Sequence, residues 1–232
     1  PTRRPAETYP WRNAWPIVNA GMPKMVARTD YAANGGDVYT SPGWPQPPLW
    51  KSAPPGDGLG PASLAEGGVG GSAKQRANAK KTFDNIAKAA TGVVYCGSAV
   101  NLADITDGAS ATYLLGEKYI DPDFYATGED PGDSKAALVG DSEDVSRWTL
   151  LPPLGDTPGY VAPWRFGSAH PSGFNMAFCD GAAKFVSYAI DPDVYRRLGN
   201  RSDEQPAKSR AGTPQPPEKG TTKETKETKH AK

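Results

Sequence analysis

The stretch FNMAFCDGAAKFVSYAI, residues 174–190, gives the strongest indication of the fold. In its first half, large apolar side chains occupy every second position, which predicts a strand with one buried face. Its second half is another run rich in residues that favour strands, and Gly181 lies between the two. A short connection that contains Gly is typical of a β-hairpin, so we expect residues 174–179 to pair with residues 183–189.

Two helices and several further strands are predicted around this hairpin. Residues 73–90 are rich in Ala and Lys, with Ser72 as a candidate N-cap and Gly92 closing the helix. A shorter helix is expected at residues 191–200, with Asp191 as its N-cap. Together these patterns predict an α+β fold, in which one main helix packs on an antiparallel sheet. Three further strands are expected at residues 92–98, 111–119 and 146–151.

The predicted strand at residues 111–119 carries side chains of different size on its two sides. Simple alternation assigns Thr112, Leu114 and Gly116 to one face. It assigns the two side chains between them, Tyr113 and Leu115, to the other face.

The composition indicates a loop-rich domain. The 232 residues include 26 glycines and 24 prolines, well above ordinary usage, together with six tryptophans and ten tyrosines. Trp11 and Trp15 are expected to anchor an irregular N-terminal segment to the folded body, whereas the polar repeat TKETKETK is typical of disorder. We expect three parts: an extended segment at 1–25, a globular head at 26–201 with a long Pro- and Gly-rich loop at 41–72, and a disordered tail at 202–232.

The charge balance excludes one class of partner. Lys and Arg number 26, as do Asp and Glu, so no overall positive field exists to attract a nucleic acid. No apolar run reaches the ~20 residues that cross a bilayer. The two cysteines, Cys96 and Cys179, are expected either to form a disulfide or to be buried as free thiols.

A calcium site is a secondary hypothesis. Asp104 and Asp107 flank a turn that leads into the strand ending at Glu117, and these three carboxylates are the candidate ligands for a hard cation. The favoured alternative is that both aspartates cap turns, because short acidic turns are common and the pattern lacks the ligand spacing of an EF-hand. Residues 121–144 hold many further carboxylates, and we expect them to form a solvated loop with at most one bound ion.

His170 and the Asp180-Gly181 pair lie on either side of the first hairpin strand. An extended segment of that length separates its ends by about 20 Å, so the two side chains are not expected to serve one reaction centre. We expect His170 to fix the loop before the strand and Asp180 to close the turn after it. No G-x-S-x-G or phosphate-binding loop occurs, so the sequence predicts no enzymatic activity. Any partner of His170 is expected among the candidate calcium ligands named above.

Several blocks of the sequence resemble a large bacterial family called domain of unknown function 1559. They lie within residues 26–203 and include TDYAANGGD at 29–37, DVSRW at 144–148 and HPSGFNMAFCDG at 170–181. The family's C-terminal signature, described as prepilin-type processing-associated, is a His, nine residues and then Asp-Gly. The resemblance implies that the following residues form a binding or structural motif: Arg147, Trp148, His170, Asp180 and Gly181.

The resemblance also implies a pilin-like head and a location. Complete family members begin with a prepilin-type signal and a long hydrophobic helix. The opening PTRRP is similar to a stretch midway through such proteins, so we expect the N-terminal half to be missing. Contact with a membrane is then expected only through that absent helix. If the missing N-terminal part carries a prepilin leader, the domain is expected to lie in the periplasm or at the cell surface.

Two functional hypotheses follow, and a third is weaker. The first is a non-enzymatic structural or interaction domain of a pseudopilin-like, secretion-associated or surface protein, which contacts other pilin-like subunits or copies of itself. The second is an extracytoplasmic binding module for calcium, a glycan or another solute. The third, a hydrolase, would have to use His170. No cofactor is expected beyond the candidate calcium ion.

Overall fold

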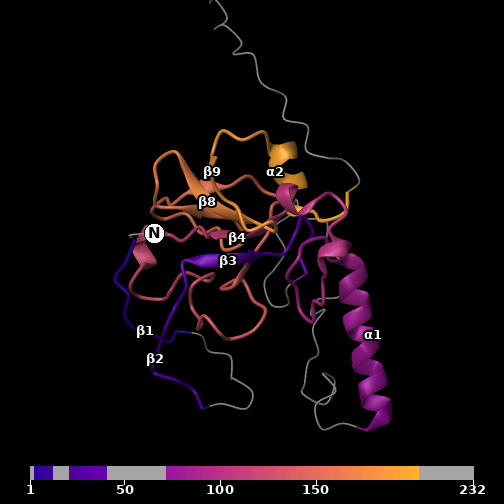
Figure 1. Ribbon diagram of the computed structural model, residues 1–232. Helices are drawn as coiled ribbons and strands as arrows, with labels where there is room; N and C mark the ends of the chain where they lie inside the picture. The colour runs from indigo at the N-terminus through magenta and orange to yellow at the C-terminus, as the bar shows by residue number, and fades with distance from the viewer. Residues whose placement is uncertain (1–2, 13–20, 41–71, 204–232) are drawn as a thin grey trace, which may run out of the picture.

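The computed structural model describes residues 3–12, 21–40 and 72–203, and its centre is a five-stranded sheet (Figure 1). Neighbouring strands are antiparallel except the first pair in the sheet, β5 and β3, which is parallel. Two helices accompany the sheet, which confirms the predicted α+β class. In sheet order the strands are β5 (Ser146–Arg147), β3 (Tyr31–Asn34), β4 (Tyr113–Glu117), β8 (Gly173–Phe178) and β9 (Ala183–Ser187).

The predicted hairpin is confirmed as β8 and β9. Its register pairs Phe174 with Val186, and both side chains face the core. At the turn, the Asp180 carboxylate accepts a hydrogen bond of 2.9 Å from the backbone N–H of Ala182. Gly181 adopts a φ of +87°, a conformation that other residues rarely take, which explains the glycine there.

The main core lies on one face of this sheet and is largely aromatic. Phe174 stacks with Phe166 and Tyr188 at centroid distances of 6.4 and 6.1 Å, and it meets Tyr195 edge-on. Tyr195 comes from α2 (Pro192–Gly199), whose N-cap Asp191 accepts two backbone hydrogen bonds as predicted. Aromatic side chains thus make up most of the buried residues of this core.

A β-bulge in β4 corrects the predicted distribution of its side chains. Tyr113 pairs with Phe178 and Leu115 with Ala177, so two steps along β4 match one step along β8. The extra residue, Leu114, shifts the alternation, and as a result Tyr113 and Gly116 both face the core. Leu115 is left on the opposite face of the sheet, where it is exposed.

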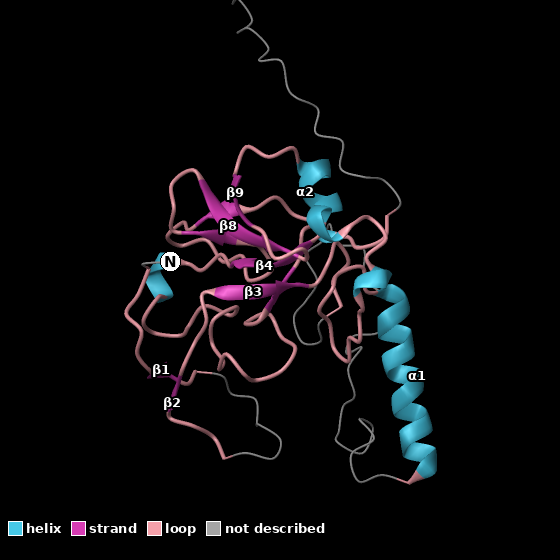
Figure 2. Cartoon of the chain, viewed as in Figure 1, coloured by secondary structure: helices cyan, strands magenta, loops and turns pink. Residues whose placement is uncertain are grey.

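The main helix, α1 (Ala73–Ala89), forms where it was predicted but does not pack on the sheet. Ser72 and Gln75 form a capping box at its N-terminus. The helix projects away from the sheet (Figure 2), and its C-terminal half packs through Ile86 against Tyr95 and Val100 of the following loop. The expected packing on the sheet is therefore wrong, because the apolar stripe of α1 is short and is covered by that loop.

Two other strand predictions are wrong in whole or in part. Residues 92–98 form bends and a turn rather than a strand, and the N–H groups of Val93 and Val94 both donate to the carbonyl of Asn34. Gly92 lies so close to Gly36 that a Cβ atom on either would come within 2.2 Å of the other's backbone. This crossing of two chain segments leaves no room for a ladder. The predicted strand at 146–151 shrinks to the two residues of β5.

The remaining elements are short. Two small sheets pair β1 with β2 and β6 with β7, and no helix in the described ranges is long and apolar enough to cross a membrane. These elements are β1 (Tyr9–Pro10), β2 (Met25–Val26), β6 (Leu154–Gly155), β7 (Gly167–Ser168), and the 3-10 helices Leu102–Asp104, Ala109–Ala111 and Pro122–Phe124.

Within the described residues, two buried arginines hold the N-terminal segment to the rest of the fold. Arg3 pairs with Asp156 at 2.9 Å, and Arg4 pairs with Asp30 at 2.8 Å and also with Asp133. The side chains of both arginines are almost fully buried. Trp11 is partly buried. The other predicted anchor, Trp15, lies outside the described residues, as do most of the loop at 41–72 and the tail from residue 204.

The acidic stretch at 121–144 is not the solvated loop that its composition suggested. The side chain of Asp133 is 1% exposed and meets three cations: Arg4, Lys118 at 2.9 Å and Arg28 at 3.7 Å. Burial alone would raise the pKa of Asp133, but Lys118 and Arg4 outweigh it and lower this pKa below its ordinary value. The loop is therefore folded inward around ion pairs whose basic partners come mainly from other parts of the sequence.

Candidate functional site

His170 and Glu117, two of the predicted site residues, meet at one end of the sheet. Nε2 of His170 lies 3.4 Å from Oε1 of Glu117, and the imidazole is 40% exposed while the carboxylate is fully buried. The other carboxylate oxygen accepts hydrogen bonds from the backbone N–H and the side-chain amide of Asn175, at 2.7 and 3.2 Å. Glu117 thus ties the loop that carries His170 to strands β4 and β8.

Asp180 and Gly181 lie at the other end of β8, in the hairpin turn described above. The backbone N–H of Asp180 also donates to the carbonyl of Ala109 at 3.1 Å. The six residues of β8 lie between His170 and Asp180. The structure therefore places the two ends of the His-nine residues-Asp-Gly pattern at opposite ends of one strand, with no shared centre.

Arg147 and Trp148 are fully buried and face the interior. The Trp148 ring packs against Tyr39 with a centroid distance of 4.6 Å. Burial lowers the pKa of Arg147, although neighbouring carboxylates oppose the shift. Both side chains hold the loops beside β5 together and present nothing to a ligand at the surface. The Arg147 guanidinium donates to the backbone carbonyls of Arg165, Ser146, Tyr119 and Gly132, at 3.0 to 3.4 Å.

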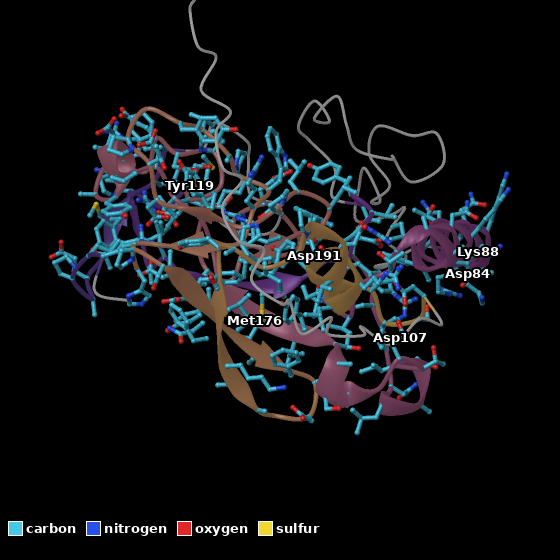
Figure 3. The ribbon with its side chains drawn as sticks, turned by 90° about the horizontal axis from the view of Figure 1, so that it is seen from above. Asp84, Lys88, Asp107, Tyr119, Met176 and Asp191 are labelled. Carbon is cyan, nitrogen blue, oxygen red and sulfur yellow. The ribbon has the colours of Figure 1, made fainter. Side chains whose placement is uncertain are left out.

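The three candidate calcium ligands do not come together. Asp104 accepts a 2.7 Å hydrogen bond from the backbone N–H of Asn101, and Asp107 accepts one of 2.8 Å from that of Asp203. In Figure 3, Asp107 lies on the opposite side of the molecule from Tyr119, which is two residues beyond Glu117. Within the described ranges, no group of three or more His, Cys, Asp or Glu side chains is arranged to hold a metal. The Asp104 contact is a local cap, as the turn interpretation predicts, whereas the Asp107 contact joins its turn to a distant part of the chain.

The two cysteines are not bonded to each other, which rules out the disulfide alternative in this structure. Each is half-buried rather than fully buried. Cys96 lies in the loop after α1, and Cys179 directly follows β8. Burial raises the pKa of Cys179 to about 11, which makes it a poor nucleophile at neutral pH.

The face of the sheet opposite the core is open, and one row of residues across it is apolar. Ala33 of β3 pairs with Leu115 of β4, which pairs with Ala177 of β8, which pairs with Ala183 of β9. Leu115 is 39% exposed. The solvent face of an antiparallel sheet ordinarily carries polar side chains, so this apolar row is unusual.

The adjacent row on the same face combines aromatic and polar side chains. Tyr31 is the strand partner of Glu117, and Asn175 is the strand partner of Phe185. A hydrogen bond from Asn175 to the Glu117 carboxylate joins the two pairs. Tyr31 and Phe185 are 43% and 54% exposed, at the two ends of this aromatic–polar row. His170 lies beside its centre through the contact with Glu117. The open face is thus the surface formed by the apolar row and the aromatic–polar row.

Phe185 is fixed in place by the glycine beside it. A Cβ atom at Gly173 would lie 2.8 and 2.9 Å from Cε1 and Cζ of the Phe185 ring, so the ring packs directly over the Gly173 backbone. The ring is therefore held against the sheet while about half of its surface remains accessible.

At the Tyr31 end, the row runs into an open groove. The groove has a volume of ≈ 620 Å³ and lies between residues 4–9 and residues 27–31, with Tyr31 itself in its wall. Burial raises the pKa of Tyr31, and the charges of Glu117 and Asp30 add to this effect. Tyr31 is consequently a neutral phenol that contributes both an aromatic surface and a hydroxyl group.

Sequence reasoning found Glu117 and His170 but missed the rest of the open face. For Asn175, the alternation of the hairpin strand indicated only that its side chain faces away from the core, and nothing indicated a role in a site. A signal for Phe185 was present, since Phe185 and Val186 are adjacent apolar residues and one of them must face outward in a strand. Tyr31 carried no signal, because its position depends on the pairing of β3 with β4.

One comparison with known proteins gives a match. A family model described as "Protein of unknown function (DUF1559)" matches residues 51–193. No curated protein matches the chain. No solved structure matches it either.

Proposed function

The chain belongs to the DUF1559 family of proteins of unknown function, and we propose that it is a non-enzymatic interaction domain that binds through the open face of its sheet. In this proposal it acts as the head of a pseudopilin-like, secretion-associated or surface protein outside the cytoplasm. Its partners are further pilin-like subunits or copies of the same chain.

The observation that carries the proposal is the apolar row. Leu115 projects from a central strand and is surrounded by alanines, so a partner surface can approach the sheet closely there. Burying such a surface stabilises a complex by roughly 25 cal/mol for each Å² of apolar area removed from water. The β4 bulge is the feature that exposes Leu115, because it reverses the side to which this residue would otherwise point.

Sedimentation velocity over a range of concentrations tests the self-association form of this proposal. We expect the wild-type chain to associate and Leu115→Lys to remain monomeric, because the lysine places a charge in the centre of the apolar row. The matched control is Leu138→Lys, since Leu138 is 97% exposed in a loop outside the sheet. Equal association of both variants with the wild type would contradict a role for the open face.

A second candidate function, a binding module for a solute, is favoured by the aromatic–polar row. That row offers accessible aromatic rings beside hydrogen-bonding groups, a combination found in ligand sites rather than on inert surfaces. Binding of a soluble ligand that shifts the amide resonances of β4, β8 and β9 would support it. Ligand-induced shifts confined to other parts of the protein would count against it.

A further inference from the structure

We infer that the aromatic–polar row is a binding site for a short neutral oligosaccharide. The inference rests on the proposed interaction role of the open face and names the class of ligand for one of its two rows. It is carried by the side chains of Tyr31, Glu117, Asn175, Phe185 and His170.

The polar centre of the row offers both donors and acceptors. Glu117 is fully buried, so it acts as a positioning residue and holds Asn175 and His170 from beneath. One amide proton of Asn175 is directed to Glu117, which leaves the other proton as a donor and Oδ1 as an acceptor. The His170 ring lies beside this carboxylate, with Nε2 3.4 Å from Oε1 of Glu117, and its other nitrogen, Nδ1, can also take part in a hydrogen bond. A hydroxyl group is suited to this mixture because it donates and accepts at once.

The charge of the centre favours a neutral ligand. The Glu117 side chain is 0% exposed and contacts His170 and Asn175, so a cationic ligand could reach its carboxylate only by displacing them. Asn175 itself is uncharged. Neither a strongly acidic nor a strongly basic ligand therefore has a matching charge at the surface of the row.

The two ends of the row provide aromatic surfaces. Tyr31 and Phe185 stand on strands that are three strand spacings apart, a separation of about 14 Å. A pyranose ring has an apolar face of C–H groups and a rim of hydroxyls, so its faces suit the aromatic rings while its rim suits Asn175 and His170. A chain of a few such rings spans the row.

The surroundings fit a linear ligand. Tyr31 also lines the groove of ≈ 620 Å³, whose other walls come from residues 4–9 and 27–30, so a ligand at this end of the row can extend into it. Packing on Gly173 holds the Phe185 ring in place before binding, so little side-chain freedom is lost when a ligand covers it. The site is thus partly preformed at both ends.

Calorimetric titration with three neutral probes tests the inference: cellohexaose, hexa-N-acetylchitohexaose and mannohexaose. We expect at least one to bind, and we expect Tyr31→Ala and Phe185→Ala each to raise its Kd roughly tenfold, equivalent to about 1.4 kcal/mol. The matched control is Tyr160→Ala, because Tyr160 is 47% exposed but lies outside the strands of the sheet. Circular dichroism establishes that each variant is folded, and Asn175→Ala gives a second test at the polar centre of the row, where it removes the amide that donates to Glu117.

The outcomes separate this inference from the proposed function. Absence of binding by all three probes, or equal weakening by Tyr160→Ala and Phe185→Ala, would overturn the oligosaccharide site. Loss of self-association in Leu115→Lys would then still support protein contacts through the apolar row. Conversely, the chain could bind sugar through Tyr31 and Phe185 and never self-associate. That result would support the oligosaccharide site and contradict only the self-association form of the proposed function.

Discussion

Replacing Asp133 by asparagine should destabilise the fold far more than the same change at an exposed ion pair. Asp133 and Lys118 are each 1% exposed at their side chains, and their charged atoms are 2.9 Å apart. Arg4 and Arg28 contact the same carboxylate. The variant keeps the shape of the side chain but leaves three buried cations without their shared counter-charge.

The expected loss follows from that burial. Removing one partner of a buried ion pair costs about 3–5 kcal/mol, because the remaining charge stays away from water without compensation. At an exposed pair the same change costs about 0.5 kcal/mol or less. The chain offers such a pair on α1, where Lys80 and Asp84 are 2.6 Å apart with side chains 76% and 49% exposed. Asp84→Asn is therefore the matched control.

Urea unfolding followed by tryptophan fluorescence measures both variants. We expect the free energy of unfolding to fall by about 3–5 kcal/mol for Asp133→Asn and to change little for Asp84→Asn. Similar losses in the two variants would refute the reasoning. They would show that the buried ion pairs of Asp133 contribute no more to the free energy of unfolding than an exposed pair does.

The pH dependence gives an independent check. Because the pKa of Asp133 is lower in the fold than in the unfolded chain, its ionised form stabilises the fold above the unfolded pKa of about 3.9. That contribution is lost as the pH falls through the lower folded pKa. Burial raises the pKa of Asp130, Asp141 and Asp156, which gives the opposite dependence. The difference between wild type and Asp133→Asn isolates one carboxylate, and it should shrink only below about pH 4.

Three further predictions concern single residues. Alkylation of Cys179 by iodoacetamide at about pH 8 should be much slower than that of a peptide thiol, because its pKa is raised to about 11; mass spectrometry showing the peptide rate would contradict this. Ser72→Ala removes half of the capping box and should cost about 1 kcal/mol, with faster hydrogen exchange in the first turn of α1; unchanged exchange there would count against the cap. Gly173→Ala would place a Cβ atom 2.1 Å from the carbonyl oxygen of Val186, so calorimetry should show a melting temperature several degrees lower; an unchanged value would show that the strand can shift to accept it.

The sequence predicted local structure where local patterns determine it. The hairpin, the capping of α1 by Ser72 and the capping of α2 by Asp191 all depend on neighbouring residues. The strand predicted at 92–98 does not form. The chain crosses close to Gly36 at Gly92, and Gly36 lies far away in the sequence, so this segment has no room for the hydrogen-bond ladder of a strand. A pattern within a short stretch of sequence cannot predict such a contact between distant residues.

The candidate site was predictable only in part for the same reason. His170 and Glu117 were identified because each stands beside a recognisable strand, and the structure brings them together. The rows of the open face depend on the register between four strands and on the β4 bulge, which moves Leu115 to the outside. Likewise, the carboxylates at 121–144 appeared solvated in the sequence because their partners Arg4, Arg28 and Lys118 lie outside that stretch.

Site-specific photo-crosslinking in native cells tests most directly whether the open face is the binding surface. A photoreactive amino acid would replace Leu115 in the apolar row, and in a separate variant it would replace the more exposed Leu138. The account predicts discrete crosslinked products from position 115 and none of the same size from position 138. Identical products from both positions, or products from position 138 alone, would contradict it.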